Sequence, residues 1–80
     1  MDEAIARHLV RTNFRCSREL QDLLKILKMQ LPAVEFDIHA KRVAMAIAHL
    51  GDALSNPALA AYPALEQEIE NDLSSYGQFL

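Results

Sequence analysis

The sequence has little of the residue types that break helices, cross-link small folds or span membranes. Among 80 residues there are two glycines, three prolines, one cysteine and no tryptophan. So few glycines and prolines, with 51% hydrophobic and 24% charged residues, exclude collagen-like and low-complexity chains and argue against disorder. A single cysteine cannot form an internal disulfide, which favours a reducing compartment. No apolar run approaches the roughly 18 residues that cross a bilayer, so no membrane partner is expected.

The start of the chain lacks the features of a secretion signal. Met1-Asp2-Glu3 is acidic, whereas a signal peptide begins with basic residues and continues with about 7–15 apolar ones. Together with the single cysteine, this predicts a cytoplasmic protein. The net charge of −3 argues against a general binder of polyanions.

The length predicts one domain over residues 1–80 with a core too small for its hydrophobic content. A single core in a chain this short supplies about 3–5 kcal/mol, and no disulfide or recognisable metal site adds to it. Yet more than half of the residues are hydrophobic. We therefore expect apolar surface to be shared between chains, in a dimer or a higher oligomer.

The sequence pattern predicts helix along the whole chain, because β-branched residues are few and neither strand alternation nor a hairpin turn is present. Proline-containing breaks predict helices over residues 2–31, 35–54 and 63–76, with a short turn at 57–61. The second helix is expected to end near Leu54, and Asn56-Pro57 reads as the start of a new one. The predicted fold class is all-α: a small antiparallel bundle of three to four helices, completed by oligomerisation.

Two narrow apolar stripes predict how the first two helices pack. Leucines at helical spacing favour one continuous helix over 2–31, whereas Ser17 is a competent N-cap that favours a break near residues 13–16. Both alternatives stay open. In the second helix the spacing of 4, 3, 4, 3 and 4 defines a heptad-like stripe, whose larger members we expect to anchor the fold. The stripe consists of Phe36, Ala40, Val43, Ile47, Leu50 and Leu54.

The first helix also carries a row of arginines, which we call the arginine ridge. Its spacing places the four on one face, and Val10 and Phe14 beside it are the apolar side chains expected to be exposed. Three interpretations stay open: a surface for an anionic partner such as nucleic acid, a solvated face, or a complement to the acidic residues 66–72 of another subunit. The candidate partner-binding residues are Arg7, Val10, Arg11, Phe14, Arg15 and Arg18.

Catalytic, cofactor and metal sites find no support in the sequence, so we predict that the protein is not an enzyme and holds no cofactor. The serines lie outside nucleophile motifs, and the two glycines cannot form a phosphate-binding loop. His39 and His49 lie about three turns apart on the predicted second helix, which excludes a shared metal within one subunit.

One histidine has a further interpretation. Ala48-His49-Leu50-Gly51 resembles the phosphohistidine helix of histidine phosphotransfer domains, which are helical bundles with an exposed histidine. Those domains have a lysine three residues after the histidine and a glycine at the fourth, where this chain has Asp52 and Ala53. The resemblance implies a phosphoryl acceptor at His49, but a carboxylate at position 52 repels a phosphoryl group.

These observations predict a small cytoplasmic protein-interaction or regulatory adaptor module that acts through helix faces. Its partners are expected to be itself and another protein. The alternative function is a nucleic-acid-binding accessory protein that uses the arginine ridge, and a more distant alternative is a histidine phosphotransfer-like module at His49.

Overall fold

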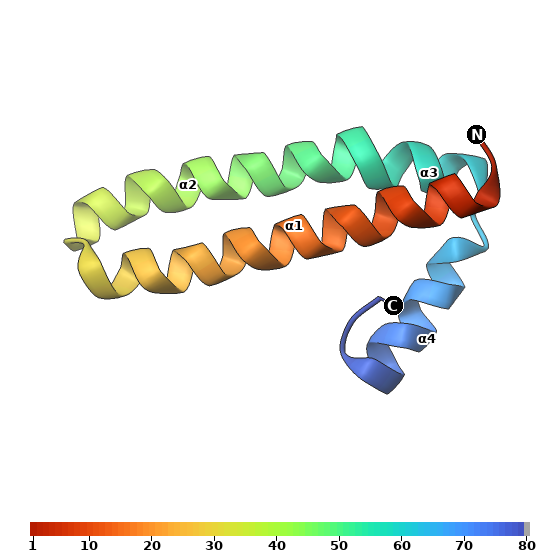
Figure 1. Cartoon of the computed structure of the whole chain (residues 1–80). Coiled ribbons are helices and arrows are strands. Elements are labelled where there is room, and N and C mark those ends of the chain that lie inside the picture. Colours follow the sequence, from red (N-terminus) through yellow and green to blue (C-terminus); the bar gives the residue numbers. More distant parts are fainter. Residues whose placement is uncertain (80) are drawn as a thin grey trace.

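The computed structural model describes residues 1–79 and is helical along almost its whole length (Figure 1). Leu80, which the predicted domain includes, lies outside the described residues. The described residues contain no strand, which confirms the all-α class and the small helical fold. The elements are α1 (Glu3–Gln30), α2 (Ala33–Leu50), a π-helical turn η1 (Gly51–Ser55), α3 (Asn56–Ala61) and α4 (Leu65–Tyr76).

The first helix is continuous, so the alternative of a break near residues 13–16 is not realised. Asp2 caps its start, since the carboxylate accepts a hydrogen bond from the Ile5 N–H at 2.9 Å. Ser17 caps nothing; its hydroxyl donates instead to the Asn13 side-chain oxygen, 3.3 Å away and one turn earlier in the same helix. The helix ends at Gln30, because Leu31 precedes a proline and takes an extended conformation.

The second helix does not end near Leu54, and that prediction is wrong. The backbone stays right-handed helical at Asn56 (φ −61°, ψ −44°), and the Asn56 N–H bonds the carbonyl of Gly51, five residues earlier. A regular α-turn would drive the Pro57 ring into the carbonyl four residues before it, whereas the wider π-turn accommodates it. Asn56 is therefore not a cap. Its amide donates to the Asp52 carboxylate at 2.9 Å, and α2, η1 and α3 form one nearly continuous rod (Figure 1).

The last helix follows a tight turn at Pro63 and ends where the sequence predicts. The N–H groups of Leu65 and Glu66 bond the carbonyls of Tyr62 and Pro63, which turns the chain sharply into α4. Gly77 stops this helix in the left-handed conformation (φ 72°), which costs a glycine little.

The elements form a long antiparallel hairpin with a short arm at one end (Figure 1). α1 runs along α2, η1 and α3, and the turn at residues 31–32 joins them at the far end. α4 folds back against the end that holds the N-terminus (Figure 1). The extents of 45 × 26 × 14 Å are those of a flat object about one helix thick.

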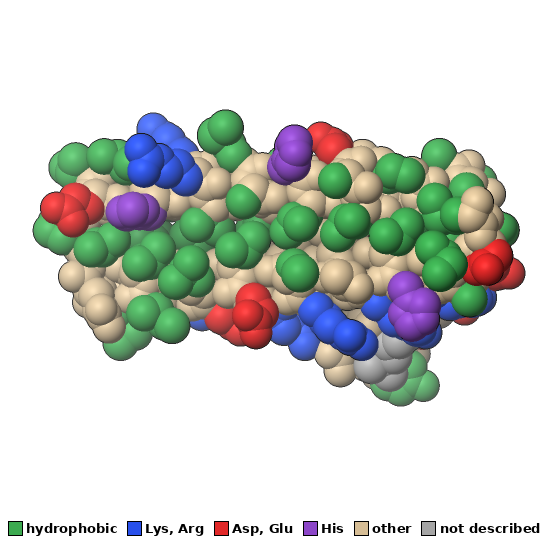
Figure 2. All heavy atoms as spheres, turned by 45° about the horizontal axis from the view of Figure 1, so that its top comes forward, with side chains coloured by type: hydrophobic (Ala, Val, Ile, Leu, Met, Phe, Trp, Pro, Cys, Tyr) green, Lys and Arg blue, Asp and Glu red, His purple; other side chains and the backbone are tan. Residues whose placement is uncertain are grey.

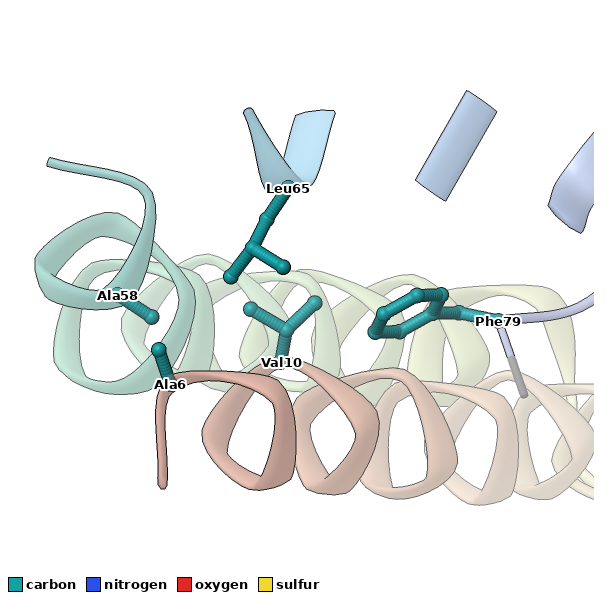
Figure 3. Close-up of a cluster of buried hydrophobic side chains, with 5 residues drawn as sticks. All are labelled: Ala6, Val10, Ala58, Leu65 and Phe79. Atoms are coloured by element: carbon teal, nitrogen blue, oxygen red, sulfur yellow. The ribbon is translucent and has the colours of Figure 1, made fainter. Parts of the chain in front are cut away.

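The core lies between the N-terminal part of α1, α3 and α4, and not along the stripe of α2 that was expected to anchor the fold. Figure 3 shows Leu65 pointing onto Val10, and Ala6 facing Ala58 across the hairpin. Phe79 completes this buried cluster. No residue of α2 is buried, because its stripe contacts α1 alone and nothing covers it from either side. Among the described residues, the fully packed region is therefore the end of the hairpin that holds the N-terminus and α3.

Candidate protein-interaction surface

The arginine ridge does not face solvent alone, because α4 and the C-terminal residues lie against it. Arg7 makes two hydrogen bonds to the Glu68 carboxylate, from Nε at 2.9 Å and from a terminal nitrogen at 3.2 Å. The same terminal nitrogen bonds Glu3 at 2.9 Å. The hydrogen bond to Glu68 raises the pKa of the Arg7 guanidinium above its ordinary value. The complementarity between basic and acidic helices that the sequence suggests between subunits thus exists within one chain.

Arg11 and Phe14 are held by Phe79, which lies after α4. The Arg11 guanidinium carbon lies 5.4 Å from the centroid of the Phe79 ring, in a cation–π contact. The Phe14 and Phe79 rings lie 6.2 Å apart at 56°, which is a tilted aromatic pair. The Arg11 Nε is buried without a hydrogen-bond partner. The ring therefore lies against the guanidinium while the Nε donor stays unsatisfied.

The expectation that Val10 and Phe14 are exposed is wrong. Val10 is 0% exposed and Phe14 is half-buried, because Leu65 and Phe79 fold over them from a distant part of the sequence. Arg15 is exposed, and the exposed Arg18 donates to the Gln78 side-chain oxygen at 2.8 Å. α4 and its C-terminal extension thus touch most of the predicted partner-binding residues, and a nucleic acid would have to compete with them.

α4 stands off the hairpin and leaves a cavity of about 390 Å³ beneath it. Val10, Phe14 and Leu59 line its apolar wall. At its base the Asn13 amide donates to the hydroxyl of Ser55, which is almost fully buried. The cavity and the bonds between long side chains indicate that few close contacts hold α4 in place.

On the opposite side of the hairpin, residues 1–79 form no second layer. On α1, Ile5, Cys16 and Leu23 lie about half a helical turn away from Val10 and Phe14, which α4 covers. A continuous apolar strip follows the groove between the two long helices on this side (Figure 2). We call this strip the open face. By helical spacing it contains Ile5, Cys16, Leu23 and Ile26 of α1, and Val43 and Leu50 of α2.

The side chains of the open face are incompletely covered. Leu23 is 40% and Ile26 is 53% exposed, and Val43 and Leu50 are half-buried although they belong to the heptad-like stripe. In a two-helix hairpin such side chains lose water only on the side that faces the neighbouring helix, so much of their apolar area stays in contact with water. A contiguous apolar strip of this kind is a feature of interaction surfaces.

Among residues 1–79, the neighbour that phosphotransfer domains place one turn after the histidine, a lysine, is replaced by an aspartate. His49 is exposed on the last turn of α2, and Asp52 lies one turn further on. Within residues 1–79, no three side chains of histidine, cysteine, aspartate or glutamate converge to hold a metal ion. In the same part of the chain, no helix is both long enough and apolar enough to cross a membrane.

Comparisons of the chain with protein-family models, with curated proteins and with solved structures give no match. The interpretation of the surface therefore depends on its own geometry. The sequence suggests the stripe of α2 and the leucines of α1, but not which side of the hairpin stays uncovered. The residues that decide which side is covered are Leu65 and Phe79, two apolar residues that are far in sequence from the helix they cover.

Proposed function

We propose that the protein is an interaction module whose open face packs against amphipathic helices of a protein partner. The observation that carries the proposal is the uncovered apolar strip along the α1–α2 hairpin (Figure 2). Domains are normally built from at least two packed layers around a core, and most of this hairpin has one. A partner helix laid into the groove supplies the missing layer, by the helix-in-groove mode of recognition.

Three features support a helical partner over an extended peptide or a nucleic acid. The strip between the antiparallel α1 and α2 is apolar along its length, and it offers ridges of side chains at helical spacing. An extended peptide adds to a sheet edge, and the described residues contain no sheet. Three of the four ridge arginines contact α4 or the residues that follow it. Their guanidinium groups would have to leave these contacts to bind the phosphates of a nucleic acid.

The experiment compares three versions of the protein as affinity baits in extracts of the source cells. The open-face variant carries Leu23→Glu and Ile26→Glu, which place charges on exposed positions of the strip. The matched control carries Val34→Glu and Met45→Glu, at positions of α2 that are 74% and 71% exposed and point away from α1. Circular dichroism establishes that all three baits are equally helical.

The expected result is a protein that the wild type and the control retain and the open-face variant loses. Its purified form should bind the wild type at least about tenfold more tightly than the open-face variant, because a charge buried against an apolar helix is left unpaired. Retention that is equal for all three baits, or lost only in the control, refutes the proposal.

A further inference from the structure

We infer that the partner on the open face is a second copy of this chain, so that two hairpins pack face to face into a four-helix bundle. The inference rests on the proposed function and names the helices that supply the missing layer. An identical hairpin matches the strip in length and in helical spacing. It brings a second apolar strip that also needs cover.

The side of the hairpin that carries the open face is large enough for a stable dimer. Two helices side by side, each about 10 Å wide, over the 45 Å length of the molecule present a face of roughly 900 Å². Stable interfaces bury about 800 Å² on each partner. A single partner helix would cover only the groove, whereas a second hairpin covers both helices along their length.

The small core of one chain also supports association with a second copy. Only Ala6, Val10, Ala58, Leu65 and Phe79 form the buried cluster of the described residues, and all lie at one end of the hairpin. The remaining length of α1 and α2 has no buried side chain, although it carries most of the large apolar residues. Face-to-face packing buries Leu23, Val43 and Leu50 and turns the half-covered stripes into the centre of a bundle.

Charge at the edge of the open face does not oppose a second copy. Arg15 and Glu19 stand on either side of Cys16 in the sequence, and Figure 2 shows both basic and acidic side chains along the edges of the strip. The other arginines of the ridge are turned toward α4 on the opposite side. Identical surfaces therefore meet without a block of like charges.

Cys16 provides a probe in the unaltered protein. It is the only cysteine of the sequence, it is exposed, and it lies at the middle of α1 on the open face. A small thiol reagent such as dithionitrobenzoate modifies an exposed cysteine quickly and one in a packed interface slowly. The rate of modification at increasing protein concentration thus shows whether association covers this face or another.

The test combines this rate with the mass in solution, from light scattering and sedimentation equilibrium between about 1 and 200 μM. We expect twice the chain mass of 9.0 kDa, with a dissociation constant below about 10 μM. Modification of Cys16 should slow at least fivefold across the transition. The Leu23→Glu/Ile26→Glu variant should dissociate at least about 30-fold more readily, as for residues at the centre of an interface. The Val34→Glu/Met45→Glu control should remain a dimer.

Each contrary result has a distinct meaning. A wild type that stays at 9.0 kDa up to 200 μM overturns the inference. The proposed function then stands if the extract still yields a different protein whose retention depends on the open face. A dimer in which Cys16 reacts at the monomer's rate, or which survives the open-face substitutions, overturns the inference by showing association through another surface. Loss of both self-association and face-dependent capture removes the inference and the proposed function together.

Discussion

Truncation of Leu65 is the most direct test of the core that the structure defines. Leu65 is only 2% exposed and packs on Val10 (Figure 3). It is the one fully buried side chain of α4, and the half-buried Ile69 packs beside the same cluster. Leu65→Ala removes three carbon groups, each worth about 0.8 kcal/mol of transfer free energy, or about 2.4 kcal/mol together. A cavity term adds to this in a rigid core, but the existing cavity under α4 lets the surroundings relax.

We therefore expect Leu65→Ala to lower the free energy of unfolding by about 2.5–3 kcal/mol. A single core in a chain this short supplies only about 3–5 kcal/mol, so the loss is large. It corresponds to a drop in Tm of roughly 10–20 °C. The measurement is urea and thermal unfolding followed by circular dichroism, at one fixed protein concentration so that any association contributes equally.

Leu73→Ala is the matched control, because it makes the same chemical change in the same helix at a residue that is 40% exposed. It should cost no more than about 1.4 kcal/mol, since 40% of that residue's surface remains in water in the folded protein. Equal losses for the two variants would refute the assignment of Leu65 to the core. They would show that α4 does not dock through this side chain.

Three further predictions follow from other contacts. Gly77→Ala should lower the free energy of unfolding by about 1–2 kcal/mol, because a φ of 72° strains any residue with a side chain. Gly51→Ala is the matched control: it lies at a helical position with open space around it, and it should raise the free energy of unfolding by about 0.5–1 kcal/mol in the same assay. Ser55→Ala should cost about 1–2 kcal/mol by leaving the Asn13 amide unpaired, and adding Asn13→Leu should recover most of it; no recovery contradicts the pairing. Arg7→Gln should speed amide hydrogen exchange in α4 severalfold with no change in the middle of α1, and 1 M salt should do the same to the wild type, because the ion pair with α4 is partly exposed; unchanged exchange contradicts its role.

The helices themselves were predictable because their signals are local. The stops at Pro32 and Gly77 act within one or two residues through backbone geometry. The prediction that failed, an end near Leu54, used an equally local rule about proline. It failed because a π-turn with one extra residue absorbs the Pro57 ring and lets the helix continue.

The candidate surface was harder to predict because it depends on what lies over each side of α1. Helical spacing places Val10 and Phe14 away from the leucines of α1. For an isolated helix, this position predicts that both side chains are exposed. Leu65 and Phe79 cover them from more than 50 residues away. Spacing within one helix cannot express such a contact, since it arises only when α4 folds back at the Pro63 turn.

The sequence by itself determined that this chain is helical, where most helices begin and end, and which residues face between α1 and α2, because these follow from periodicity and local backbone preferences. Only the tertiary structure decided which side of the hairpin α4 covers. That choice buries Val10 and engages the arginines on one side, and it leaves the open face uncovered on the other. The physical reason is that α4 is long enough to cover one side of one end of the hairpin, while the apolar strip runs along all of it.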